Sequence, residues 1–280
     1  MIDTHLHLWD LNRNRYGWLE GNTTVLNKTY LWEDIEPEIS SNEVKGVVLV
    51  QADNHFGDTD FMLENARKHS LIRGVVGWLP LLSVRETEEK LAFYSQNSYF
   101  KGIRHLIHDE KNSRWLLQPS VMESLELVAK ANLSYDVVGV LSEHLECAMQ
   151  IAEKIPSLRL VLDHLNKPGV NISIDTWKTL LKRAASYPNI YVKISGLGDC
   201  TQKPFTWTAE DIKPWIDFVI ETFGVERCMI GSDYPVALLS GSYSFTLSCY
   251  KECILSLVSD SEAKKIFSTN ATSFYRLTDI

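Results

Sequence analysis

Polar side chains with the chemistry of a hydrolytic site recur at the ends of apolar segments in this chain. His5 and His7 lie two residues apart near the start, Asp163 and His164 follow an apolar segment midway, and Asp233 follows another late in the chain. Because alternate residues of a strand project to the same side, His5 and His7 would point into one space. Three imidazoles and a carboxylate can bind one divalent metal or can activate water without one.

Eight short apolar or β-branched segments precede or contain these polar groups, and each predicts a strand. The predicted strands are 2–8, 46–52, 73–81, 102–107, 133–140, 158–165, 190–197 and 228–234. Segments with helical periodicity lie between most of them, including 59–69, 121–131, 141–154, 174–187 and 209–223. Strands that alternate with amphipathic helices form βαβ units and a parallel sheet. Eight such units without a glycine-rich dinucleotide motif favour a single-domain α/β fold, the (β/α)8 TIM barrel, over residues 1–280.

A parallel barrel gathers the ends of its strands on one face, which is where its catalytic residues lie. The last strand is next to the first when the barrel closes, so Asp233 is expected beside His5 and His7 as the general base for water. Two further helices, 244–258 and 262–277, are predicted to pack on the exterior of the barrel.

The first connection, residues 10–45, is the longest and contains Trp18 and Trp32. Long βα connections are often functional, so it is predicted to plug or cover the barrel or to form a lid over the pocket, and these two roles are compatible. Aromatic and polar residues near strand ends would bind the substrate, and this set comprises Gln51, Trp78, Lys167 and Trp32. Lys193 could be a site cation or could pair with a neighbouring carboxylate. His69, His108 and His144 are interpreted as surface or structural residues.

Composition excludes several classes of partner. The net charge is −8 and no long basic cluster occurs, which argues against nucleic acid and anionic membranes as main partners. No apolar segment reaches the length of a membrane span, and no signal peptide is evident. Five cysteines without a Cys-x-x-Cys motif are interpreted as free thiols, so the expected location is the cytoplasm. A homodimer is the default expectation for such an enzyme.

Six motifs, in this order, resemble those of the amidohydrolase superfamily, in the amidohydrolase-2 branch that includes sugar-acid lactonases and pyrone-dicarboxylate lactonase. They are Ile2-Asp-Thr-His-Leu-His-Leu-Trp9, Val50-Gln-Ala-Asp53, Gly102-Ile-Arg-His105, Val161-Leu-Asp-His-Leu-Asn-Lys-Pro168, Val192-Lys-Ile-Ser-Gly-Leu197 and Arg227-Cys-Met-Ile-Gly-Ser-Asp-Tyr-Pro-Val236. The resemblance implies hydrolysis, most often of a lactone. It places His5, His7, His164 and Asp233 in the active site, and it implies that Arg104 and His105 bind or polarise the substrate.

The chain departs from metal-rich members of that superfamily, which carry a further metal ligand on the fourth strand and a histidine on the fifth. Its fifth strand offers Tyr135 and Asp136 instead. A binuclear centre is therefore not expected, although His5, His7, His164 and Asp233 could hold one zinc or manganese ion. Members of the branch work with or without metal, so the requirement stays open, and no organic cofactor is expected.

The leading hypothesis is a lactonase that acts on a small sugar-derived or carboxylated lactone with water activated by Asp233. One alternative is a metal-dependent decarboxylase on the same barrel, which would release carbon dioxide instead of a ring-opened acid. Another is a non-catalytic sugar-binding protein, although binding alone does not need all four residues His5, His7, His164 and Asp233.

Overall fold

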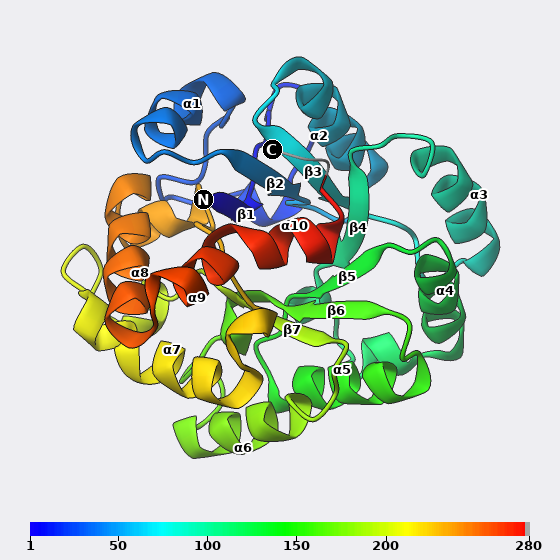
Figure 1. Cartoon of the computed structure of the whole chain (residues 1–280). Coiled ribbons are helices and arrows are strands. Elements are labelled where there is room, and N and C mark those ends of the chain that lie inside the picture. The colour runs from blue at the N-terminus through cyan, green and yellow to red at the C-terminus, as the bar shows by residue number, and fades with distance from the viewer. Residues whose placement is uncertain (278–280) are drawn as a thin grey trace.

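Eight parallel strands pair in chain order around a barrel in the computed structural model, which describes residues 1–277 (Figure 1). The strands are β1 (Ile2–Leu6), β2 (Gly46–Val50), β3 (Ile72–Gly77), β4 (Phe100–His105), β5 (Ser134–Val137), β6 (Arg159–Leu162), β7 (Ile190–Ile194) and β8 (Cys228–Ile230). Almost every strand residue is buried, because the inner side packs in the barrel and the outer side packs on helices. The fold confirms the predicted (β/α)8 barrel.

Helices surround the strands on the outside of the barrel (Figure 1). They are α1 (Trp32–Ser41), α2 (Phe56–Lys68), α3 (Val84–Tyr94), α4 (Pro119–Lys130), α5 (Ser142–Lys154), α6 (Ile174–Ala184), α7 (Ala209–Phe223) and α8 (Tyr243–Leu257). Helix α6 illustrates why they lie there, since its buried residues Trp177, Leu180, Leu181 and Ala184 recur at helical spacing and form one apolar face.

The barrel closes between β1 and β8, where hydrogen bonds cross the seam. The backbone N–H of Asp233 donates to the carbonyl of His5 at 2.8 Å, and that of His7 donates to the carbonyl of Tyr234 at 2.7 Å. The buried carboxylate of Asp3 accepts from the backbone N–H of Ser232 at 2.8 Å. This pairing places the histidines of β1 beside Asp233, as the sequence predicted.

The C-terminal segment corrects one expectation. In place of one exterior helix over 262–277, the chain forms α9 (Asp260–Lys264), a π-helical segment η8 (Lys265–Thr269) and α10 (Asn270–Tyr275). Helix α10 lies across the middle of the barrel in Figure 1. Phe274 and Tyr275 pack against Ile2, Val48 and Met229, which belong to the barrel strands. These large apolar side chains cover the end of the barrel opposite the catalytic face, so α10 is the floor of the barrel.

The strands end earlier than the apolar pattern indicated. β6 stops at Leu162, and His164, Leu165, Asn166 and Lys167 follow with positive φ values of 51° to 57°. Asp233 also has a positive φ, of 65°. Left-handed backbone cannot continue a strand. The polar residues at the strand ends therefore lie in short irregular turns, and these turns aim their side chains.

None of the helices within residues 1–277 has the length and apolar character needed to cross a membrane. All five cysteines are buried as free thiols.

Candidate active site

Three imidazoles surround one oxygen of Asp233. The Oδ1 atom lies 3.4 Å from Nε2 of His7, 3.7 Å from Nε2 of His5 and 3.8 Å from Nε2 of His164. All four side chains are buried. His5 lies in β1, His7 directly follows β1, and His164 and Asp233 lie in the turns after β6 and β8. The structure therefore brings the four predicted catalytic residues together.

Two of the histidines are oriented by groups behind them. Nδ1 of His7 donates to the carbonyl of Val50 at 2.7 Å, and Nδ1 of His164 lies 2.9 Å from the hydroxyl of Ser195. Burial lowers the pKa of His164 to about 4, an effect that Asp233 opposes and Lys167 reinforces. His164 is therefore neutral near pH 7, with Nε2 directed toward Asp233.

Asp233 is ionised despite its burial. Burial alone would raise its pKa, but His164, His7, His5 and Lys167 outweigh burial and lower the pKa below its usual value. The backbone at Gly196 approaches this site closely. A Cβ on Gly196 would lie 2.7 Å from Oδ2 of Asp233 and 2.7 Å from Nδ1 of His164. Glycine at 196 thus allows the carboxylate and the imidazole to meet.

Arg104 at the end of β4 is held by buried acceptors. Its Nε donates to Oε1 of Gln51 at 3.1 Å, its Nη2 donates to the carbonyl of Gln51, and its Nη1 donates to Oδ2 of Asp163 at 3.1 Å. A guanidinium has five N–H donors, so these three bonds fix Arg104 while leaving donors for a ligand. Gln51, predicted to touch the substrate, is fully buried and instead holds Arg104.

A cavity of about 250 Å³ opens above Asp233. Its polar wall consists of His7, Arg104, His108, Asp109, His164, Lys167 and Asp233. Its apolar wall consists of Trp9, Trp18, Ala52, Leu106, Val138, Val140 and Val236. A concave site with an apolar side and a few converging polar groups is typical of a small-molecule pocket. His5 is fully buried and lies beneath Asp233, outside this lining.

Three of the residues predicted to bind the substrate also lie outside the cavity wall. Trp32 is fully buried at the start of α1 and stacks on His69 at 5.2 Å between ring centroids, so it belongs to the core. Trp78 donates through Nε1 to Nδ1 of His105 at 3.0 Å. His105 stacks on Trp115 at 4.0 Å. These contacts make Trp78 and His105 a packed support beside the site.

Four aromatic or polar residues of the cavity wall were not predicted to bind the substrate. Trp9 directly precedes the first connection and Trp18 lies within it, where Nε1 of Trp18 donates to the carbonyl of Ala52 at 2.9 Å. His108, which was interpreted as surface or structural, and Asp109 lie in a short 3-10 helix after β4. Trp9 could have been found, because it continues the alternation of His5 and His7, but the loop positions carry no such periodic signal.

The site fits one divalent cation. One nitrogen from each of His5 and His164 and one oxygen of Asp233 all lie within 4.8 Å of one another. Imidazole and carboxylate are suitable ligands for zinc, and imidazoles whose other nitrogen is held by the protein are typical of metal sites. His7, the fourth predicted ligand, reaches the same carboxylate oxygen at 3.4 Å.

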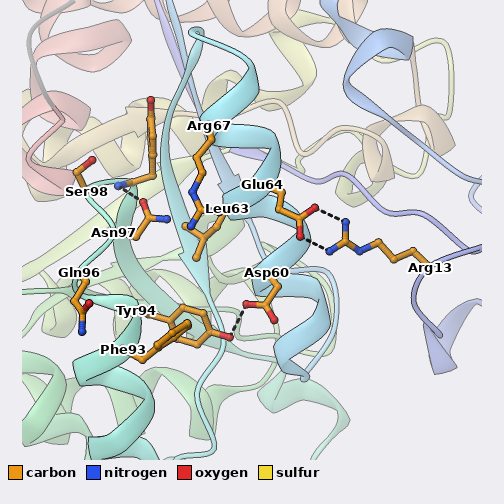
Figure 2. Close-up of a pocket in the computed structure, with 11 residues that line it drawn as sticks. Arg13, Asp60, Leu63, Glu64, Arg67, Phe93, Tyr94, Gln96, Asn97 and Ser98 are labelled. Carbon is orange, nitrogen blue, oxygen red and sulfur yellow. Dashed lines mark hydrogen bonds and ion pairs between the residues drawn. The ribbon is translucent and has the colours of Figure 1, made fainter.

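A larger hollow of about 700 Å³ lies on the outer wall, at α2, α3 and the turn that follows α3 (Figure 2). Figure 2 shows the paired hydrogen bonds between Arg13 and Glu64 and the bond from Tyr94 to Asp60 that border it. We call this hollow the outer groove, and none of the residues that line it is a histidine or a cysteine. It therefore lacks the converging imidazoles and carboxylate of the 250 Å³ cavity, which is the candidate active site.

Comparisons with known proteins agree with this geometry. The chain is 27% identical to an L-fucono-1,5-lactonase of Burkholderia ambifaria, over 99% of this chain and 95% of that protein. It is 32% identical to an uncharacterised protein of Sinorhizobium fredii, over 99% and 98% of the two chains. A crystal structure of a Burkholderia multivorans amidohydrolase with bound zinc superposes with a TM-score of 0.90 at 27% identity, over 99% of each chain. The family model described as amidohydrolase matches residues 2–277. The chain belongs to the amidohydrolase family, which confirms the resemblance drawn from its six motifs.

Proposed function

We propose that the protein is a lactonase that opens the ring of a sugar-acid lactone. The observation that carries this proposal is an ionised carboxylate, Asp233, which borders a cavity and is surrounded by three imidazole nitrogens within 3.8 Å. An L-fucono-1,5-lactonase is among the relatives of the chain, which supports a lactone of a monosaccharide acid as the substrate.

Asp233 acts first as the general base. A water molecule in the cavity gives a proton to Asp233, and its oxygen attacks the carbonyl carbon of the lactone. The tetrahedral adduct then collapses with cleavage of the bond between the carbonyl carbon and the ring oxygen. Asp233 returns the proton to that oxygen, so the product is a hydroxy acid and the carboxylate is regenerated.

The negative charge that develops on the carbonyl oxygen needs donors directed at it. Arg104 lines the cavity with unused N–H groups, and the bonds to Gln51 and Asp163 hold it in place. Lys167 lies nearby, with its ammonium 2.9 Å from Asp199. A divalent cation held by His5, His164 and Asp233 would add Lewis-acid polarisation of the same carbonyl.

The cavity walls suit a monosaccharide ring. Trp9 and Trp18 provide an aromatic face, while His108 and Asp109 offer hydrogen-bonding groups for ring hydroxyls on the polar wall. The first connection supplies Trp18, which supports its proposed role as a lid. We expect the enzyme to act in the cytoplasm as a homodimer.

Acid release from a panel of aldono-1,4- and 1,5-lactones tests the proposal, with a pH indicator, enzyme-free blanks for spontaneous opening, and parallel samples with chelator. We expect turnover of at least one lactone. Turnover that survives chelation assigns the chemistry to Asp233 and the donors around it, whereas loss with chelator and recovery with zinc or manganese assigns carbonyl polarisation to the metal. Absence of turnover across the panel would refute the proposal, and carbon dioxide release from a carboxylated substrate would replace it with a decarboxylase.

A further inference from the structure

A buried lysine beneath the active site has no role in the steps described above. Lys193 on β7 is fully buried, and its ammonium lies 2.5 Å from Oδ2 of Asp136, 3.1 Å from Oδ1 of Asp163 and 3.2 Å from Nδ1 of His5. An ammonium has three N–H donors, and buried donors are almost always bonded. The ammonium therefore bonds to Asp136, contacts a ring nitrogen of His5 and forms an ion pair with Asp163.

The position of Lys193 is fixed from the floor of the barrel. The hydroxyl of Tyr275 in α10 donates to Oδ2 of Asp136 at 2.8 Å, and the Lys193 ammonium lies 5.5 Å from the centre of the Tyr275 ring. The chain around Tyr275 is anchored in turn, because the carbonyl of Phe274 accepts from Arg159 and that of Arg276 accepts from Lys101. Tyr275 is thus a rigid contact point on Asp136 from the end of the barrel opposite the cavity.

His5 has a cation at each ring nitrogen, since Nη1 of Arg104 lies 3.2 Å from its Nε2. A neutral imidazole has one acceptor nitrogen, so only one of these cations can donate to it. Each ring nitrogen of His5 also faces a carboxylate, since Nδ1 lies 3.3 Å from Oδ1 of Asp163 and Nε2 lies 3.7 Å from Oδ1 of Asp233. Lys193 and Asp163 together therefore hold the Nδ1 edge of the ring, and the Nε2 edge is directed toward Asp233.

We propose that Tyr275, Asp136 and Lys193 are positioning residues that fix the ring of His5 and, through it, the catalytic carboxylate of Asp233. Continuous contacts run from the floor of the barrel to the general base: Tyr275 to Asp136, Asp136 to Lys193, Lys193 to His5, and His5 to Asp233. The inference rests on the proposed function insofar as it assigns the base to Asp233.

A double-mutant cycle, measured by steady-state kinetics, tests this series of contacts. It uses the full-length enzyme and the lactone that the enzyme turns over best. Tyr275→Phe removes only the hydroxyl, whereas Lys193→Met would leave the buried carboxylate of Asp136 without a cation and could prevent folding. We expect Tyr275→Phe to lower kcat about tenfold with KM changed less than about twofold, because a disturbed general base affects the chemical step and not substrate binding. In a His5→Gln background the same substitution should cost no further activity, since contacts that act through one residue are not additive. An undiminished kcat in Tyr275→Phe, or an equal loss in both backgrounds, would overturn the proposal.

Tyr94→Phe is the matched control, because Tyr94 is also a buried tyrosine whose hydroxyl donates to a carboxylate, Asp60 at 3.0 Å, but on the outer wall. It should leave kcat unchanged.

Nitrogen NMR of His5 in the metal-free protein gives a readout that needs no substrate. We expect the ring nitrogen resonances of His5 to differ between the native protein and Tyr275→Phe, because the contacts at Nδ1 change. An unchanged His5 spectrum would count against the proposal, and a shift without any lactone turnover would refute the lactonase function alone.

Discussion

At the scale of single residues, the site depends on keeping one carboxylate charged inside the protein. Asp233 is buried, yet the surrounding imidazoles and Lys167 lower its pKa, so it is available as a base across the neutral range. Lys193 and His5 likewise lower the pKa of Asp163 well below its usual value against the effect of burial. Each of these buried carboxylates thus has basic groups beside it that stabilise its charge, as a preorganised hydrolytic site requires.

Replacing Asp233 by asparagine keeps the shape of the side chain and removes its ability to accept a proton. We expect kcat to fall about 100- to 10,000-fold, the range over which a general base contributes. Circular dichroism and the melting temperature should stay close to those of the native protein. Glu64→Gln, which changes a carboxylate of the outer groove, should keep full activity. Near-native turnover by Asp233→Asn would show that another group activates the water.

At the scale of elements, the turns after the strands determine how the site residues meet. Gly196 follows β7 with φ of +55°, and a Cβ there would approach both Asp233 and His164 to 2.7 Å. Gly196→Ala should therefore displace both groups and lower kcat at least about tenfold, since small misplacements of catalytic groups are costly. Gly224→Ala is the control, because Gly224 has φ of +76° but open space around its Cβ. It should lose about 1–3 kcal/mol of stability to backbone strain while its kcat stays native. Equal kcat values for the two variants would show that the close approach at Gly196 does not affect catalysis.

The first connection contributes an aromatic wall, and its role can be separated from that of the catalytic groups. Trp18 lines the cavity and is held by its hydrogen bond to Ala52. Trp18→Ala should raise KM about tenfold, equivalent to the loss of about 1.4 kcal/mol of ring contact, with kcat nearly unchanged. Trp18→Phe, which keeps an aromatic ring without the N–H donor, should give a smaller increase in KM. A fall in kcat with an unaltered KM would place Trp18 among the catalytic groups instead.

At the scale of the whole molecule, the seam between β1 and β8 joins the two parts of the site. Asp3 is fully buried there and accepts from the backbone of His5 at 3.1 Å, from the backbone of Ser232 at 2.8 Å and from the hydroxyl of Tyr243 at 3.1 Å. Removing it by Asp3→Ala leaves three buried donors without an acceptor. We expect the free energy of unfolding to fall by about 3 kcal/mol, as measured by urea denaturation. Asp10→Ala, which removes a more exposed carboxylate bonded within its own loop, should cost less than about 1 kcal/mol. Similar losses in the two variants would mean that the seam is not a special point of stability.

The barrel and the centre of the site could be predicted because they depend on local patterns. His5, His7, His164 and Asp233 stand at the ends of apolar segments, and parallel strands bring such ends to one face. Tertiary contacts decided the rest. Trp32 looked like a pocket residue because of its type, but it begins a helix whose apolar face is buried. His108 carries no periodic signal in its loop, and nothing local indicates that Tyr275 reaches into the barrel.

The crossing of the seam has a consequence for the synthesis of the protein. The histidines of β1 leave the ribosome early, while Asp233 follows the last strand of the barrel. With Asp233 as the proposed general base, a nascent chain has no lactonase activity until β8 docks beside β1. Catalytic activity thus reports that the first and last strands have met. Co-translational assays could use it as a switch-like signal that the barrel has closed.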